Sequence, residues 1–108
     1  MDRTVEVLKE CGSMLPFDEL LAALSEECVE LSHAALKYRR ALNQINVTPK
    51  KEDSAYLDFL EELCDVFNVI VSAGIVDPKC RIMDYCDATK ADRWKSRLIE
   101  TRSNSDVR

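Results

Sequence analysis

The feature that most constrains the fold of this chain is how few of its residues can interrupt a helix. Across its 108 residues, glycine occurs only at positions 12 and 74, and proline only at positions 16, 49 and 78. Glycine weakens a helix through its backbone entropy and proline removes a backbone donor, so these residues tend to mark helix ends. The long stretches between them contain few runs of β-branched residues. The sequence therefore predicts an all-α protein.

Between these breaks, apolar residues recur at steps of three and four, which is the period of an α-helix. We expect helices over residues 4–11, 17–43, 48–73 and 77–101, the third starting at Thr48-Pro49 and the fourth at Asp77-Pro78. Threonine or aspartate before proline favours a helix start, and a glycine such as Gly74 favours a stop. We predict one helical domain over residues 1–102, followed by a frayed tail over residues 103–108.

The two long helices each carry an apolar stripe that we predict to be buried. The stripe of the second helix is Leu20, Leu24, Cys28, Leu31, Ala35, Tyr38 and Leu42, and that of the third is Leu57, Leu60, Leu63 (or Cys64), Phe67, Ile70 and Val71. A short polar link joins these helices, so they should pack as antiparallel neighbours.

Charge and cysteine content narrow the class of protein. The net charge of −5 disfavours a nucleic-acid polymer as partner, because binding to a phosphate backbone relies on an excess of lysine and arginine. Cys11, Cys28, Cys64, Cys80 and Cys86 are odd in number and form no CxxC pair. We therefore expect reduced thiols and a cytoplasmic protein, with Cys28 and Cys64 as small core residues. No segment reads as a membrane span, and the first residues do not resemble a signal peptide.

Acidic residues form one cluster on each of the two long helices. Residues 26–30 read EECVE, and residues 61–65 read EELCD. Since residues three apart share a helix face, Glu27 should lie beside Glu30, and Glu62 beside Asp65. No basic residue occurs between positions 52 and 78, so nothing close in the sequence balances the second cluster.

A cation would resolve the repulsion between these acids. Like charges at this spacing destabilise a helix by about 0.2–0.5 kcal/mol per pair, and two facing stripes would cost more. Carboxylates are the ligands that Mg²⁺ and Mn²⁺ prefer, and such ions bridge phosphate oxygens and activate water. A solvated acidic surface is the more ordinary explanation. Glu27, however, lies at the edge of the apolar stripe, between Leu24 and Leu31, which favours a metal site.

The two acidic motifs resemble those of the all-α NTP pyrophosphohydrolase superfamily, the MazG-like proteins and their relatives among the dimeric dUTPases. That family carries ExxE on one helix and ExxD on the next. Glu27-Cys28-Val29-Glu30 and Glu62-Leu63-Cys64-Asp65 fill these places here, and Glu26 and Glu61 stand where the family doubles its acids. The resemblance extends over residues 17–98 and includes the phrases LSEECVELSHAALKY and FLEELCDVFNVIVSAG.

The last predicted helix adds to this resemblance. Family members end with a basic and aromatic phrase of the type NxKFxxRF. Here Arg93 stands for the lysine, Trp94 for the phenylalanine and Arg97 for the arginine. Ala91 replaces the asparagine, so its polar contact is lost or passes to Lys90, and the stretch between the two acidic motifs is longer than usual.

The resemblance implies a four-helix MazG-like bundle that uses Mg²⁺, with Mn²⁺ as a substitute, to cleave a nucleoside triphosphate. Water would attack the α-phosphorus and release a nucleoside monophosphate and pyrophosphate. In that scheme the metal ligands are Glu27, Glu30, Glu62 and Asp65; Glu26 or Glu61 orients or deprotonates the water; and Lys90, Arg93 and Arg97 contact phosphates. These basic residues could equally serve to stabilise the helix C-terminus. The resemblance also implies a homodimer or homotetramer, in keeping with the thin core that four short helices provide.

Three alternatives stay open. Glu30-Leu31-Ser32-His33 is an ExxH motif of the kind found in carboxylate-bridged di-iron or di-manganese bundles, although these need two copies and His33 is the only histidine. The acids could instead only solubilise a non-enzymatic interaction module. A phosphoribosyl-ATP pyrophosphatase would share the fold and the chemistry, and contacts to base and ribose would have to distinguish it.

Overall fold

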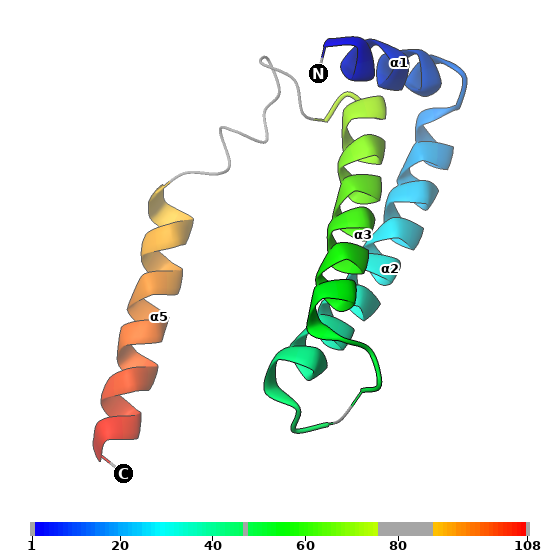
Figure 1. The fold of residues 1–108 in the computed structure, drawn as a ribbon. Coiled ribbons are helices and arrows are strands. Elements are labelled where there is room, and N and C mark those ends of the chain that lie inside the picture. The colour runs from blue at the N-terminus through cyan, green and yellow to red at the C-terminus, as the bar shows by residue number, and fades with distance from the viewer. Residues whose placement is uncertain (1, 47, 76–87, 108) are drawn as a thin grey trace. The chain divides into compact units, whose positions relative to one another are not determined.

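The computed structural model of the chain describes residues 2–46, 48–75 and 88–107, and all regular secondary structure among them is α-helical (Figure 1). The helices are α1 (Asp2–Ser13), α2 (Phe17–Asn43), α3 (Glu52–Ser72) and α5 (Ala88–Val107). The predicted all-α class is thus confirmed. The chain divides into two compact units, Met1–Asp77 and Pro78–Arg108, which are described separately below. Assembly of the helices into one MazG-like domain stays a prediction.

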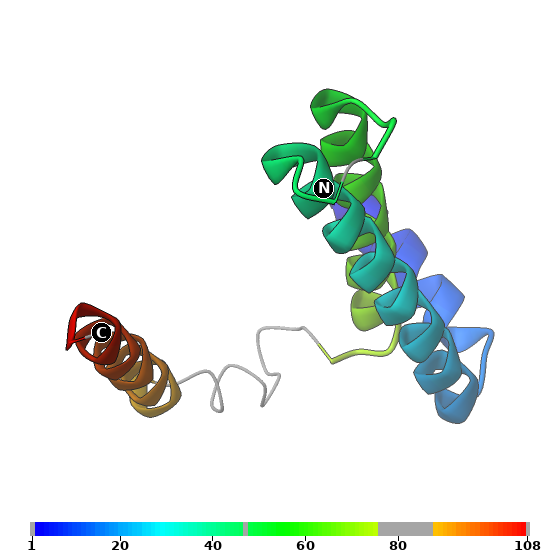
Figure 2. The ribbon, with the colours of Figure 1, turned by 90° about the horizontal axis from the view of Figure 1, so that it is seen from below.

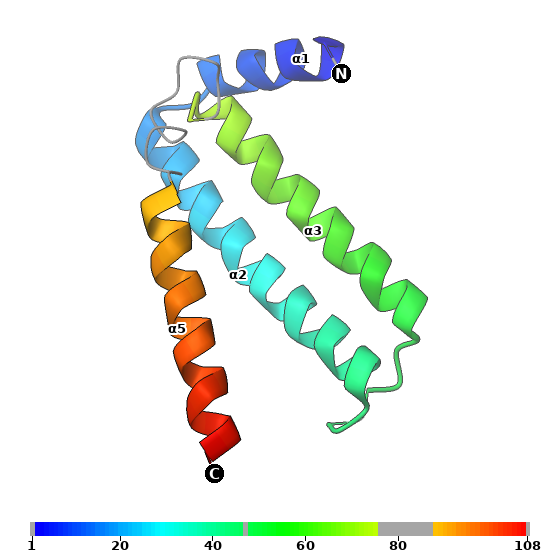
Figure 3. The same cartoon turned by 90° about the vertical axis from the view of Figure 1, so that its left-hand side faces the viewer.

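In the first unit, α2 and α3 form an antiparallel hairpin and lie side by side in each view (Figures 1, 2 and 3). Small side chains lie where the two helices meet: Ala34 and Ala41 of α2 and Ala55 of α3 are all buried. Toward the connection between the helices, the ring of Tyr38 packs against Tyr56 and Phe59, with centroids 5.4 and 5.9 Å apart. Small residues permit a close approach of the helices, and the aromatic rings pack beside them at the interface.

The ends of α2 agree with the sequence pattern. The helix begins at Phe17 after the extended residue Pro16 and ends at Asn43, as predicted. Gln44 then adopts the left-handed conformation with φ 55°, and its backbone N–H donates to the Arg40 carbonyl oxygen at 2.9 Å. This hydrogen bond satisfies a carbonyl at the helix end that would otherwise lack a partner.

The predicted start of the third helix at Thr48-Pro49 is wrong. The helix begins at Glu52, after an extended N-cap residue, Lys51. The Thr48 hydroxyl oxygen accepts a hydrogen bond from the Lys50 backbone N–H at 3.4 Å, so it supports a local turn and caps no helix. The predicted stop is correct, since α3 ends at Ser72 and Gly74 has a positive φ of 72°.

Helix α1 lies across the C-terminal end of α3 (Figures 1 and 3). The backbones approach so closely at Gly12 that a Cβ atom there would lie 1.9 Å from the Ser72 carbonyl oxygen. Val71 is buried at the same end of α3. Only glycine fits at position 12, because any side chain would push the two helices apart.

The predicted buried stripes are only partly buried within this unit: Leu20 and Val71 are buried as predicted, but many of the other stripe residues are exposed. On α2, Cys28, Ala35 and Leu42 are exposed; on α3, Leu57, Leu60, Leu63, Cys64 and Phe67 are exposed. The expectation that Cys28 and Cys64 are core residues is therefore wrong, and both are free thiols. The reason is that each helix turns a different face to its neighbour, the face that carries the small residues and half-buried Glu27 and Glu62.

The exposed apolar residues of both helices lie on the same side of the hairpin. Each residue advances about 100° around a helix, so Cys28 lies about 160° from Glu26, and Leu63 about 160° from Glu61. Acids of both helices line one groove on the opposite side. We call the first surface the apolar side (Leu21, Cys28, Ala35, Leu60, Leu63 and Phe67) and the second the acid side (Glu26, Glu30, Asp58, Glu61 and Asp65).

In the second unit the structure describes α5, which extends to Val107. The predicted frayed segment is therefore helical over residues 103–107. Trp94, Leu98 and Ile99 are exposed on this helix. The predicted helix start at Asp77-Pro78, and the cysteines at positions 80 and 86, lie outside the described residues. None of the described helices is long and apolar enough to cross a membrane.

Candidate metal centre

Four carboxylates meet between α2 and α3. Glu27 and Glu30 come from α2, and Glu62 and Asp65 come from α3. One oxygen from each lies within 4.8 Å of the oxygens of the other three. The spacing of three residues puts each pair on one helix face, and the antiparallel packing brings the two pairs together. The structure therefore brings together the four residues that the sequence analysis assigned as metal ligands.

Two oxygens of this cluster are buried without a hydrogen-bond partner. They are the Oε2 atoms of Glu27 and Glu62, whose side chains are half-buried, while Glu30 and Asp65 are exposed. A buried polar atom without a partner destabilises the folded chain, because its interaction with water is lost and nothing replaces it. A cation coordinated by these oxygens would remove this deficit.

Two of these carboxyl groups, Glu27 and Glu62, resist ionisation because their pKa values are raised. Burial raises the pKa of Glu27 above its ordinary value of 4.5, and the negative charges of Glu30 and Asp65 raise it further. Burial likewise raises the pKa of Glu62, with the charge of Glu30 as the next cause. A divalent cation would reverse both effects, since an adjacent positive charge favours the carboxylate form.

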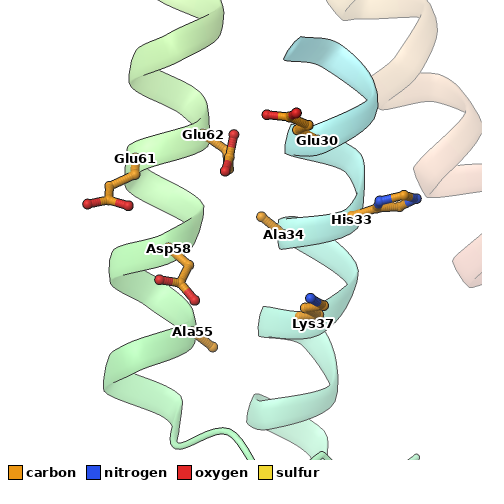
Figure 4. Close-up of a pocket in the computed structure, with 8 residues that line it drawn as sticks. All are labelled: Glu30, His33, Ala34, Lys37, Ala55, Asp58, Glu61 and Glu62. Atoms are coloured by element: carbon orange, nitrogen blue, oxygen red, sulfur yellow. The ribbon is translucent and has the colours of Figure 1, made fainter. Parts of the chain in front are cut away.

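The chemistry of the donors suits a hard divalent cation. All four clustered side chains offer oxygen only, which Mg²⁺, Mn²⁺ and Ca²⁺ favour over nitrogen or sulfur. The nearby thiol of Cys64 is directed to the Oδ1 atom of Asn68 at 4.0 Å and does not belong to the cluster. His33 is likewise outside it, and Figure 4 shows its ring pointing away from α3. Within the described part of one chain, the ExxH motif therefore builds no di-iron site.

A groove of about 230 Å³ extends from the cluster along the acid side (Figure 4). Figure 4 shows Glu62 pointing toward α2 near Glu30; further along, Ala34 of α2 and Ala55 of α3 both point into the space between the helices, with Ala55 nearer the level of Lys37. The residues that line the groove are Glu30, His33, Ala34, Lys37, Ala55, Asp58, Glu61 and Glu62. Asp58 forms an ion pair with Lys50, which lies near the end of the connection, just before α3. The groove gives a ligand access to one end of the carboxylate cluster.

The two predicted catalytic acids lie outside the cluster. Glu26 and Glu61 are both exposed. Glu61 lines the groove, with its side chain directed away from α2 (Figure 4). Glu26 is close enough for its charge to contribute to the raised pKa of Glu27. Their role in activating water stays a prediction.

The predicted phosphate-binding residues belong to the second unit. Lys90, Arg93 and Arg97 are exposed on α5. The Nε atom of Arg97 donates to the Arg93 carbonyl oxygen at 3.4 Å, and both side chains line a hollow of about 640 Å³. The structure does not place this unit relative to the carboxylates, so the phosphate-binding role of these residues also stays a prediction.

The sequence analysis did not single out Lys37, which also lines the groove. It follows Glu30 by seven residues, or two helix turns, and therefore occupies the same face of α2. The helical spacing that placed the acidic residues on one face could also have identified Lys37. Ala34 and Ala55 gave no such signal, because an alanine carries no chemistry of its own.

No known protein family, no curated protein and no solved structure matches this chain. What the site can do is therefore inferred from its own geometry and from the two acidic motifs.

Proposed function

We propose that the chain is a Mg²⁺-dependent nucleoside triphosphate pyrophosphohydrolase of the cytoplasm. The observation that supports this most directly is the cluster of four carboxylates in which two buried oxygens lack a partner. The resemblance of its two motifs to the MazG-like family supplies the class of substrate. Mn²⁺ would serve as a substitute, because it accepts the same oxygen ligands.

In this proposal Glu27, Glu30, Glu62 and Asp65 hold the ion. Bound Mg²⁺ supplies charge neutralisation on the phosphates and a more acidic water. The water oxygen forms a bond to the α-phosphorus, and the bond from that phosphorus to the bridging oxygen breaks. Pyrophosphate leaves with the electron pair, and Glu61 or Glu26 accepts the proton of the water. Catalysis is then mainly positioning and charge stabilisation.

We also infer that the protein is a homo-oligomer. The apolar side exposes a hollow of about 480 Å³ lined by α3 residues, among them Leu60, Leu63 and Phe67. Within the described first unit, α1 covers only the C-terminal end of α3. A second copy of the chain would bury these residues in a two-fold interface, because each copy presents the same surface.

The decisive experiment is pyrophosphate release from a panel of canonical and modified (d)NTPs, with Mg²⁺ and with EDTA. The wild type is compared with Glu62→Gln and with Glu10→Gln, a control on α1 that removes one exposed acid far from the cluster in sequence. We expect release that needs Mg²⁺, is lost in Glu62→Gln and is retained in Glu10→Gln. No release from any nucleotide, with no thermal stabilisation by Mg²⁺, would favour the non-enzymatic interaction module.

A further inference from the structure

The groove on the acid side changes its charge along its length. At the cluster end it is lined by Glu30 and Glu62, with Glu61 at the rim. At the other end it is lined by Lys37 and Asp58, and Asp58 is ion-paired with Lys50. Two positive charges against one leave the far end with a net positive charge, on a chain whose net charge is −5. If a cation holds one end of an extended anion at the carboxylate cluster, the positive charge at the far end of the groove would attract the other end of that anion.

Lys37 is available to bind such an anion. Among the described residues its ammonium forms no ion pair, whereas Lys50 is committed to Asp58. Seven residues of helix separate it from Glu30, a rise of about 10 Å. A four-carbon lysine stem and a chain of phosphates can together span this distance, since an ammonium lies about 2.8 Å from a phosphate oxygen that it binds.

We propose that Lys37 binds the β- and γ-phosphates of the substrate and stabilises the leaving pyrophosphate. This assignment rests on the proposed function. When the bond between the α-phosphorus and the bridging oxygen breaks, the electron pair and the new negative charge remain on pyrophosphate. The Lys37 ammonium lies at the end of the groove where that charge would develop. Lys37 thus becomes a substrate-binding residue within the same unit as the carboxylates.

The size of the groove favours phosphates over the nucleoside at this end. Its volume of about 230 Å³ is smaller than the roughly 300–1,000 Å³ of typical small-molecule sites. Its lining contains two alanines and no phenylalanine, tyrosine or tryptophan, and the ring of its one histidine, His33, points away from α3 (Figure 4). An ammonium is a compact charge that suits a phosphate oxygen.

The test measures binding of inorganic pyrophosphate to the full chain in Mg²⁺ by calorimetry, alongside binding of a nucleoside monophosphate. The variants are Lys37→Met, Lys37→Arg and Lys9→Met, the last a control for loss of one positive charge on α1. We expect Lys37→Met to bind pyrophosphate about tenfold more weakly, as loss of a charged hydrogen bond implies. Lys37→Arg and Lys9→Met should stay within about twofold of the wild type, and monophosphate affinity should not change.

Each other result has a distinct meaning. A wild type that releases and binds pyrophosphate while Lys37→Met binds it equally well would overturn the assignment of Lys37 and leave the proposed function standing. Weaker monophosphate binding with unchanged pyrophosphate binding would place Lys37 at the nucleoside and overturn the assignment too. A wild type that neither cleaves nucleotides nor binds pyrophosphate would overturn both.

Discussion

The acid side and the apolar side of the α2–α3 hairpin come from the same two helices, yet they differ in what would complete them. The acid side gathers four carboxylates, two with buried oxygens that have no partner. The apolar side leaves large side chains such as Leu63 and Phe67 each 44% exposed. Within the described part of the first unit, one side therefore lacks a positive charge beside its carboxylates, and the other lacks a covering surface. A single helix can contribute residues to both the acid side and the apolar side, because residues two apart in sequence point to nearly opposite sides of the helix.

The largest effect should come from the acid side, on cation affinity. Changing any one of the four clustered acids to its amide should weaken Mg²⁺ binding by about 100-fold or more. Mutating a residue that only supports a metal ligand typically weakens metal binding by about 10–100-fold, and loss of a direct ligand should weaken it at least as much. Glu26→Gln and Glu61→Gln should weaken it far less, because these residues lie outside the cluster. Calorimetric titration with Mg²⁺ would measure both groups. Equal losses in all six variants would mean that overall negative charge, and no defined site, attracts the ion.

The second test changes a residue of the apolar side and measures self-association. Leu63→Asp should weaken self-association by about 100-fold, because each copy in a two-fold interface loses the burial of a leucine, about 1.5–3 kcal/mol. Light scattering at several protein concentrations would show the shift to monomer. Lys51→Asp, at an exposed position outside the hairpin's apolar side, serves as the matched control. A wild type that is already monomeric at high concentration would contradict the proposed oligomer.

A third test concerns the end of the hairpin that α1 covers. Gly12→Ala should lower the free energy of unfolding by about 1–3 kcal/mol, because the new methyl group would overlap the Ser72 carbonyl and force the helices apart. Glu6→Ala on the same helix should change it by less than about 0.5 kcal/mol. Urea denaturation followed by circular dichroism would compare the two. An unchanged stability in Gly12→Ala would show that α1 does not dock as described.

The smallest expected effect is on pH dependence without a cation. Glu27 and Glu62 have raised pKa values in the folded chain, so between pH 4.5 and those values the folded chain binds more protons than the unfolded chain. Their contribution to stability is therefore greatest below pH 4.5 and falls as the pH rises through the raised pKa values. In EDTA, the melting temperature of a Glu27→Gln/Glu62→Gln variant should exceed that of the wild type by a few degrees at neutral pH.

The matched measurement adds Mg²⁺. It should raise the melting temperature of the wild type at neutral pH and leave that of the double variant unchanged, because only the wild type has the ligands. At pH values below 4.5 the ion should have little effect on either protein. If the two proteins follow the same pH curve in EDTA, the clustered acids do not carry the shifts described.

Much of the hairpin and its acids could be predicted from the sequence, since both depend on local spacing. The start and end of α2 follow from the Pro16 break and the apolar period, and the acid pairs follow from spacings of three residues. The start of α3 could not be predicted in the same way. The Thr48 hydroxyl oxygen can accept a hydrogen bond either from the first turn of a helix or from a backbone N–H in a local turn, and here it accepts from Lys50 within a turn. Which of these hydrogen bonds forms depends on tertiary packing, because the position at which α3 packs against α2 sets where the helix begins.

The predicted core was only partly correct, with Leu20 and Val71 buried as expected, and its errors have a different reason. Periodicity identifies an apolar stripe such as the one through Leu60 and Phe67, but it does not say which neighbour covers it. The face of α3 that packs against α2 instead contains Ala55 and Val66, which are buried and lie on a different face of the helix from Leu60 and Phe67. The groove was missed because it is lined partly by small residues of two separate helices, Ala34 and Ala55, which local spacing does not connect (Figure 4).

In the proposed metal site, the alanines between α2 and α3 have a consequence for which ion would bind. Ala55 is 1% exposed and lies two turns from Glu62, so its size helps to fix how far apart α2 and α3 stand. Mg²⁺ requires oxygens at about 2.0–2.1 Å, whereas Ca²⁺ takes them at about 2.3–2.6 Å in a looser shell. The Ala55 methyl group would thus act as a spacer, and we expect a bulkier residue in its place to shift the preference of the proposed site toward the larger ion.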